Sequence, residues 1–414
     1  MRGSSTVWIR VFFALFVASL GVSASHAQIT DPAETPFAPG ARHRVLLIPL
    51  DDRPATTQFA QMMGSIAQLS VETPPASMLG RFTTPGQSDA ILDWLERVPV
   101  HQYDSVLVNI EMVCYGGLIS SRTNDTPKDV AIQRLRRLWK VRKANPGVRF
   151  YGFGAVQRIA PTALRTTRPW RDALTQLVLL KSKIVGKPTE AQVKRAKDLR
   201  SKVPYGEVEA YYEARSRNHA VQQELLRMTA ARAFDYLVLG QDDAQQEGPH
   251  VVENRRLAEM AKNLKIVNKV FFCEGIDQHS NVLLSRSILG RQNWTPAVHV
   301  EFADEIGKGK VAPYESTHVE ESLLDQVRAS GARIEPDPAQ ADYTLYVNTP
   351  DPRPDHFKTF VEKLTSDVDQ GFPVAVADIN LGTNGTEDVR LFDSLQESGR
   401  SMRLLSYAGW NTAG

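Results

Sequence analysis

The sequence predicts an α/β protein in which parallel strands alternate with helices, in a larger N-terminal lobe and a smaller Rossmann-like lobe. Two observations support this fold class. Short runs of consecutive apolar residues, typical of strands buried on both faces of a parallel sheet, alternate with longer helical stretches. A loop-rich composition at residues 307–310 and at Pro313 then separates the last runs from the first ones. We therefore expect two lobes.

The strands predicted for the N-terminal lobe are residues 45–50, 69–72, 105–110, 149–155, 236–240, 270–273 and 298–302. Seven βα units fit an incomplete or distorted TIM-like barrel, and they also fit a large doubly wound sheet. Hydrophobic periodicity is the same in both architectures, so both stay open.

A long helical tract, residues 170–233, interrupts the N-terminal lobe between the fourth and fifth strands. Breaks near residues 186–188 and 203–204 divide it into helices. It is either a solvated helical hairpin or a lid over the substrate. The lobe as a whole is predicted at residues 44–306, and the smaller, incomplete lobe at 311–414, with a helix at 319–330 and strands at 333–335, 344–347, 374–377 and 404–407.

The first 27 residues are typical of a secretory signal peptide. Arg2 and Arg10 are basic, residues 11–22 are apolar, and Ala27 ends a small-residue cleavage site. Residues 28–43 form a Pro-containing leader. We therefore expect an exported protein, periplasmic or extracellular, and no later segment is long and apolar enough to predict a membrane span.

Charge and motifs narrow the expected ligands. The chain has 49 Lys and Arg against 47 Asp and Glu, and the signal peptide holds two arginines and no acid, so the mature chain is balanced. Balance of this kind argues against a nucleic-acid partner. The second lobe has no Gly-x-Gly-x-x-Gly after its first strand, and the chain has no Walker phosphate loop, so no nucleotide cofactor is predicted.

Only Cys114 and Cys273 are present, which excludes a disulfide-rich scaffold and a four-cysteine zinc site. Both follow apolar runs. A disulfide between them and two buried free thiols are equally compatible with the sequence.

Carboxylates follow three predicted strands of the N-terminal lobe. Asp51 and Asp52 come after the first strand, Glu111 after the third, and Asp242 and Asp243 after the fifth. Because the carboxyl ends of parallel strands carry the ligand sites of such folds, we predict these five as catalytic residues. The alternative is that an Asp caps the next helix and pairs with a neighbouring arginine.

Further polar and aromatic residues lie at other predicted strand ends and loops. We predict that they bind substrate: Arg53, Tyr115, Arg122, Arg158, Asp277, Asp378, Asn380, Trp410 and Asn411. No His-x-His, His-Glu-x-x-His or calcium-loop spacing is present, so no metal residue is assigned. A Mg²⁺ or Ca²⁺ ion held by carboxylates alone remains an alternative.

Four segments together resemble an uncharacterised bacterial family, domain of unknown function 4127 (DUF4127). They are residues 49–54 (PLDDRP), 111–122, 239–244 (LGQDDA) and 407–412 (YAGWNT), and they span nearly all of the mature chain. The family has no assigned activity, so the resemblance implies positions rather than a reaction. Members look longer than this chain, so we expect it to be truncated after Gly414.

These features favour an exported hydrolase with a carboxylate-rich cleft that acts on a glycan or glycoside. Paired carboxylates divide the acid and the nucleophile or base roles in most glycosidases, and arginine and aromatic side chains suit sugar binding. Two other hypotheses stay open, a non-catalytic periplasmic protein that binds a solute or glycan, and a metal-dependent hydrolase. The sequence gives no oligomeric state.

Overall fold

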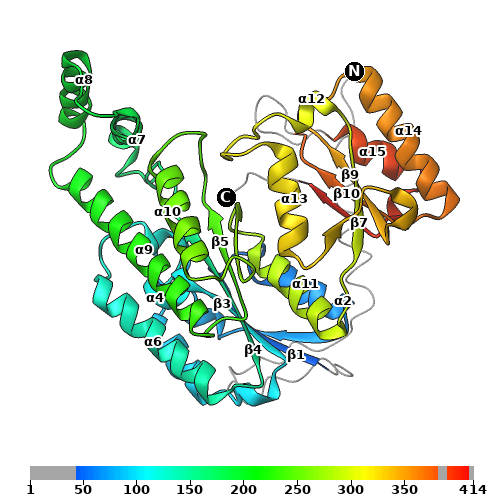
Figure 1. Cartoon of the computed structure of the whole chain (residues 1–414), viewed down its shortest axis with the longest axis horizontal. Helices are drawn as coiled ribbons and strands as arrows, with labels where there is room; N and C mark the ends of the chain where they lie inside the picture. The colour runs from blue at the N-terminus through cyan, green and yellow to red at the C-terminus, as the bar shows by residue number, and fades with distance from the viewer. Residues whose placement is uncertain (1–42, 381–388, 410–414) are drawn as a thin grey trace, which may run out of the picture. The chain divides into compact units, whose positions relative to one another are not determined.

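Two all-parallel sheets form the framework of the protein (Figure 1). The computed structural model describes residues 43–380 and 389–409. The first sheet has six strands in the order β2-β1-β3-β4-β5-β6. They are β1 (His43–Ile48), β2 (Leu69–Glu72), β3 (Ser105–Asn109), β4 (Arg149–Val156), β5 (Tyr236–Gln241) and β6 (Val270–Glu274). We call this sheet and its helices the first lobe.

The second sheet has five strands in the order β11-β10-β9-β7-β8. They are β7 (Ala297–Phe302), β8 (Arg333–Ile334), β9 (Tyr343–Asn348), β10 (Val374–Asp378) and β11 (Ser406–Gly409). We call this sheet and its helices the second lobe. When the strands of each sheet are numbered along the chain, both sheets contain the order 2-1-3-4-5. The two lobes are therefore wound in the same way.

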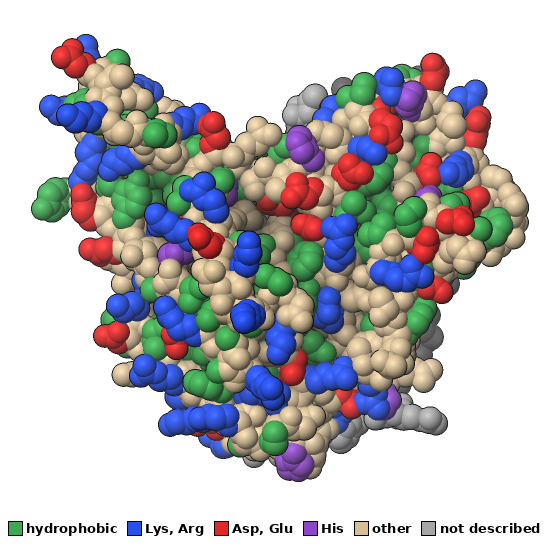
Figure 2. Space-filling view, viewed as in Figure 1, with side chains coloured by type: hydrophobic (Ala, Val, Ile, Leu, Met, Phe, Trp, Pro, Cys, Tyr) green, Lys and Arg blue, Asp and Glu red, His purple; other side chains and the backbone are tan. Residues whose placement is uncertain are grey.

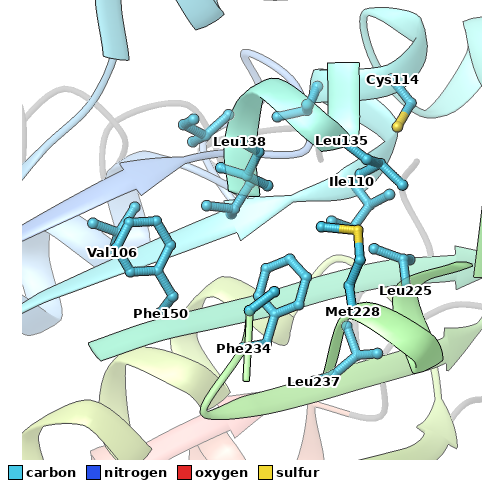
Figure 3. Packing of buried hydrophobic residues seen from close by; sticks show 14 of the residues in the cluster. Val106, Ile110, Cys114, Leu135, Leu138, Phe150, Leu225, Met228, Phe234 and Leu237 are labelled. Atoms are coloured by element: carbon cyan, nitrogen blue, oxygen red, sulfur yellow. The ribbon is translucent and has the colours of Figure 1, made fainter. Parts of the chain in front are cut away.

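Continuous apolar strands arise because each strand of the first sheet feeds two cores. Along β1, Val45 and Leu47 pack into the core on one face, whereas Leu46 and Ile48 pack into the core on the other. Side chains of a strand alternate between faces, so both sets must be apolar when both faces are covered. Figure 3 shows the larger core, in which Phe150 of β4 and Leu237 of β5 lie beneath residues of the covering helices.

The helices that follow most strands of the first lobe cover this larger core. They are α3 (Ser88–Arg97), α4 (Ile110–Tyr115), α6 (Lys128–Ala144), α9 (Glu207–Ala230) and α10 (Pro249–Asn263). The opposite face is covered by α2 (Gln58–Ile66) and α11 (His279–Gln292), which contribute Ala60, Leu283 and Leu284 to the smaller core. Short helices α5 (Leu118–Ser121), η2 (Ala76–Met78) and η3 (Val100–Gln102) complete the loops.

The second lobe has its own core, in which Tyr346 of β9 is fully buried against Phe360 and Leu364. Its helices are α12 (Glu305–Lys308), α13 (Val319–Ala329), η4 (Pro338–Gln340), α14 (Pro354–Gln370), α15 (Arg390–Glu397) and η5 (Ser401–Arg403).

The α/β class is confirmed, and the structure decides between its two architectures. The first sheet ends at β2 and β6, and no pairing in the described residues joins these two edges, so the sheet is open and doubly wound rather than barrel-like. The strand predicted at 298–302 is present as β7, but it pairs with β8 and β9 of the second sheet. The change of sheet therefore lies before residue 297, not after residue 306.

The helical insertion is present as α7 (Arg168–Lys183), α8 (Glu190–Ser201) and α9, with breaks where Gly and Pro predicted them. Both cysteines are free and buried. Cys114 lies in the larger core and Cys273 in the smaller one, on opposite faces of the sheet, so a disulfide between them is excluded. No helix of the described residues is long and apolar enough to cross a membrane.

The two lobes contact each other at the end of β6 and along α11, where Arg286 donates to the Ala329 carbonyl of α13 at 2.8 Å. The side chain of Gln326 in α13 donates to the backbone carbonyl of Glu274 at 2.7 Å, and the Ser316 hydroxyl donates to the Glu274 carboxylate. The loop before α13 also approaches β5, where the Ala244 N–H donates to the Tyr314 carbonyl at 2.7 Å. The loop between β7 and α13 of the second lobe thus contacts the carboxyl ends of β5 and β6 in the first sheet.

Candidate functional site at the carboxyl edge of the first sheet

The loop after β1 holds Asp51 as a structural acceptor. Its Oδ1 accepts the backbone N–H of Arg53 at 3.1 Å and the hydroxyl of Thr56 at 2.9 Å, while the Arg53 Nε lies 2.9 Å from Oδ2. Asp52 differs, because about a third of its side chain is exposed and its nearest cation, Arg81, is 3.8 Å away. Of the two, Asp52 is the one available to a ligand.

Arg53 ties this loop to the other end of the sheet. Its Nη1 and Nη2 donate to the two carboxylate oxygens of Asp277 at 2.8 and 2.7 Å. Asp277 follows β6, so the ion pair spans the carboxyl edge from β1 to β6. The structure therefore brings together two of the residues predicted to bind substrate.

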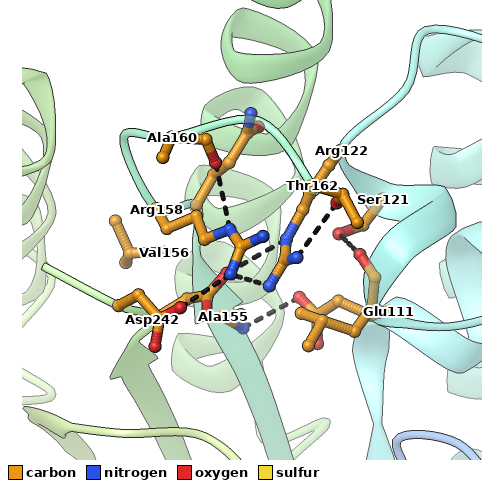
Figure 4. A network of polar contacts seen from close by, with 12 residues as sticks. Glu111, Ser121, Arg122, Ala155, Val156, Arg158, Ala160, Thr162 and Asp242 are labelled. Atoms are coloured by element: carbon orange, nitrogen blue, oxygen red, sulfur yellow. Dashed lines mark hydrogen bonds and ion pairs between the residues drawn. The ribbon is translucent and has the colours of Figure 1, made fainter. Parts of the chain in front are cut away.

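The Asp pair after β5 is bound by two arginines from other loops (Figure 4). Arg122, at the end of α5, donates from Nε and Nη2 to Asp242 Oδ2 at 3.1 and 2.6 Å, and from Nη1 to the Thr162 hydroxyl at 3.2 Å. Arg158, after β4, donates to Asp243 at 2.6 Å. The first pair is buried, whereas half of the Asp243 side chain is exposed.

Glu111 lies beneath this network, at the first turn of α4. Its Oε1 accepts the Ala155 N–H of β4 at 2.8 Å, and its Oε2 accepts the Asn109 amide at 3.1 Å. Asn109 also caps α4, because its Oδ1 accepts the Met112 N–H at 2.7 Å. Burial, reinforced by the charge of Asp242, raises the pKa of Glu111 to about 7.

These side chains form two layers. Glu111, Asp242 and Arg122 make a buried floor, and the partly exposed rim consists of Asp52, Arg53, Arg158, Asp243 and Asp277. The floor lies at the ends of β3, β4 and β5. The loops after β1 and β3 also flank the point where the strand order of the sheet reverses, which is where open α/β sheets bind ligands.

Tyr115 lies elsewhere. It is 4 % exposed, belongs to the larger core and has the Arg217 guanidinium 4.2 Å from its ring centroid. The reason is local, since the chain enters the short helix α4 directly after β3 and turns this side chain inward. Tyr115 therefore presents no surface to a ligand, which corrects its predicted role.

Asp378 and Asn380 belong to the corresponding edge of the second sheet. Asp378 accepts the Asn348 amide at 2.9 Å and the Tyr407 hydroxyl, and Asn380 accepts the Asp351 N–H at 3.0 Å. These partners all lie in the second lobe. Trp410 and Asn411 lie outside the described residues.

Sequence reasoning missed a buried acid in the second lobe. Asp304 follows β7, caps α12 through the Ile306 N–H, and accepts the Arg353 Nε at 2.8 Å. The hydrogen bond from Arg353 lowers the pKa of Asp304 well below its usual range. The signal was present, because an acid follows an apolar strand here too.

A second unpredicted feature is the acidic junction between the lobes. Glu274 is 5 % exposed and its pKa is raised mainly by burial. In the facing loop, burial and then the charge of Glu274 raise the pKa of Glu315 to about 8. Within residues 43–380 and 389–409, no group of three or more His, Cys, Asp or Glu is arranged to hold a metal ion.

Two surface depressions of about 410 and 430 Å³ lie away from this edge. One is lined by residues of α13, including His318 and Glu321, and the other by residues of α6, including Arg134 and Lys140. Neither includes a predicted site residue. The candidate site therefore rests on the side-chain chemistry at the strand ends.

Comparison with protein families gives one result. The family described as "Protein of unknown function (DUF4127)" matches residues 45–414. The chain belongs to this family. No curated protein and no solved structure matches it. The DUF4127 match includes every residue of the floor and the rim, so the candidate site lies wholly within the matched residues.

Proposed function

We propose that this DUF4127 protein is an exported hydrolase that acts on a glycan or glycoside at the carboxyl edge of the first sheet. The observation that carries the proposal is the contrast between Glu111 and Asp242. Glu111 is buried with a pKa raised to about 7, whereas the neighbouring Asp242 is bound by the Arg122 guanidinium. Two carboxyl groups in such different environments can take different roles in one reaction.

In this scheme Glu111 supplies or accepts the proton, and Asp242, bound by the Arg122 guanidinium, is the second carboxyl group. Glycosidases need both states at once, an acid to protonate the leaving oxygen and a carboxylate to act as nucleophile or base. The partly exposed rim residues Arg53, Arg158 and Asp243 would bind sugar hydroxyl groups, because arginine and carboxylate side chains offer several donors and acceptors.

The test is a turnover screen with nitrophenyl glycosides and polysaccharides, with and without chelator, on wild type and Glu111→Gln. Glu335→Gln, at the end of β8, is the control. We expect a chelator-insensitive activity that Glu111→Gln lowers by about a hundredfold or more and Glu335→Gln preserves. The activity should also fall as pH rises through about 7, because Glu111 then loses its proton.

Activity that chelator abolishes would instead favour a metal-dependent hydrolase.

A second candidate function is binding without turnover. One reason is that Arg53, Arg122 and Arg158 are each already paired with an aspartate, as in a preorganised binding surface. A second reason is that two similarly wound lobes are an arrangement found in periplasmic receptors. Saturable sugar binding with no turnover, unaffected by Glu111→Gln, would decide for it.

A further inference from the structure

The charge of the chain is balanced overall but concentrated locally. Residues 165–202, which contain α7 and α8 and which we call the basic arm, hold eleven Lys and Arg against three Asp and Glu. Figure 2 shows these basic side chains gathered on the α7–α8 region at the upper left of the view. A charge excess of this size on one element creates a strongly positive local potential and attracts anionic partners.

The arm is folded, and its charges point outward. Leu174, Leu177 and Val178 of α7 pack with Leu199 of α8 and with Val203 in a small apolar core. The apolar faces of the two helices are thereby buried against each other, and their polar faces are exposed to solvent. The hairpin is therefore held mainly by this apolar core, with one polar link between the helices, from Arg195 of α8 to the Gln176 side chain of α7 at 2.7 Å.

Five of the arm's basic residues have a carboxylate partner. Lys183 pairs with Glu247, Arg195 and Lys202 share Asp198, Arg200 pairs with Glu209, and Arg171 with Asp172. The other six have no carboxylate partner among the described residues, namely Arg165, Arg168, Lys181, Lys187, Lys194 and Lys197. All six are exposed, so they can be neutralised by an external anion.

The arm starts at the candidate site. Residues 157–167 lead from the end of β4 to α7, and within them Thr162 accepts a hydrogen bond from Arg122 of the floor. At the other end of α7, Lys183 pairs with Glu247 of the loop after β5. Two exposed basic residues, Arg165 before α7 and Arg168 at its first position, thus follow the rim residue Arg158 in the sequence.

We propose that the basic arm binds a carboxylate-bearing polysaccharide, such as a polymer of uronic acids, and holds it beside the site at the carboxyl edge. Lys194, Arg195 and Lys197 lie at helical steps of about 100° and so face more than one direction. A flexible polyanion can follow such a surface, whereas a flat anionic bilayer would touch only part of it. The choice of a glycan over other polyanions rests on the proposed function.

The experiment measures binding rather than turnover. Full-length protein is titrated with fluorescent polygalacturonate and with neutral dextran of similar length, from about 50 to about 500 mM salt. We expect binding to polygalacturonate alone, weakening steeply with salt. The double variant K194Q/K197Q should bind about tenfold more weakly with a shallower salt dependence, because two ionic contacts are lost.

A matched double variant, R136Q/K140Q, removes two exposed charges from α6 and should bind as wild type does. The proposal would be overturned if both double variants lost the same affinity for polygalacturonate. It would also be overturned if dextran bound as tightly as polygalacturonate, or if polygalacturonate did not bind. Tighter binding of duplex DNA or of phosphatidylglycerol vesicles would overturn it too, and would identify a different partner. The absence of hydrolysis by wild-type protein that binds polygalacturonate as expected would refute the proposed function alone.

Discussion

Arg53 and Asp277 form a bidentate ion pair although three strands lie between the strands they follow. Arg53 comes after β1 and Asp277 after β6, and β3, β4 and β5 separate these two strands in the sheet. The pair is reachable because α2 and α11, which begin near these residues, pack against each other on the same face. It joins the two ends of the rim over 224 residues of sequence.

Asp277→Asn should loosen this connection at small cost to overall stability. The side chains are 31 % and 42 % exposed, so water and salt screen the pair and we expect a loss of about 0.5–1 kcal/mol in urea unfolding. Glu224→Gln, which breaks the local helix pair with Arg227, is the control and should cost less. Equal losses of unfolding free energy in the two variants would show that the long-range pair stabilises the protein no more than the local helix pair does.

Replacement by Asn should destabilise the protein far more at Asp242 than at Asp52. Asp242→Asn leaves the buried guanidinium of Arg122 without its counterion, which should cost about 3–5 kcal/mol. Asp52→Asn affects a partly exposed carboxylate with a distant partner and should cost less than about 0.5 kcal/mol. Thermal and urea unfolding of both variants would test this contrast, and similar stabilities would contradict the assignment of floor and rim.

Stability should fall between about pH 4.5 and pH 7 partly because of Glu111. Its folded pKa, about 7, lies above its ordinary value of 4.5, so the folded state holds the proton more tightly and loses this advantage as pH rises. The shift corresponds to at most about 3 kcal/mol. Glu111→Gln should flatten the pH profile of unfolding relative to wild type. Parallel profiles would mean that the carboxyl group titrates normally.

Gly240 should tolerate no side chain. A Cβ there would lie 2.0 Å from His279 Cε1 and 2.1 Å from the Gly275 carbonyl, and His279 is fully buried. Gly240→Ala should therefore cost about 2 kcal/mol or more, because ring and backbone must both move. Gly147→Ala, where no atom lies within 4 Å of the new methyl group, is the matched control. Equal melting temperatures would disprove this close packing.

Sequence reasoning found the inner strands of the first sheet because both of its faces are covered, which makes strands such as β3 and β5 apolar at consecutive positions. It could not place β7, because the choice of sheet depends on pairing partners far along the chain. It located the acids at the strand ends but not their partners, since Asp242 meets Arg122 across 120 residues. Tyr115 was misjudged because a helix begins directly after β3, where the glycines at 116 and 117 indicated a ligand loop.

The described chain crosses from one sheet to the other a single time, between α11 and β7. A genetic cut within residues 293–296 would therefore leave each sheet complete and would convert the lobe contact at Glu274, Gln326 and Ser316 into an association between two polypeptides. The strength of that contact could then be read directly as a dissociation constant. The same cut would give two fragments for a complementation assay, in which reassembly reports the association of the proteins fused to them.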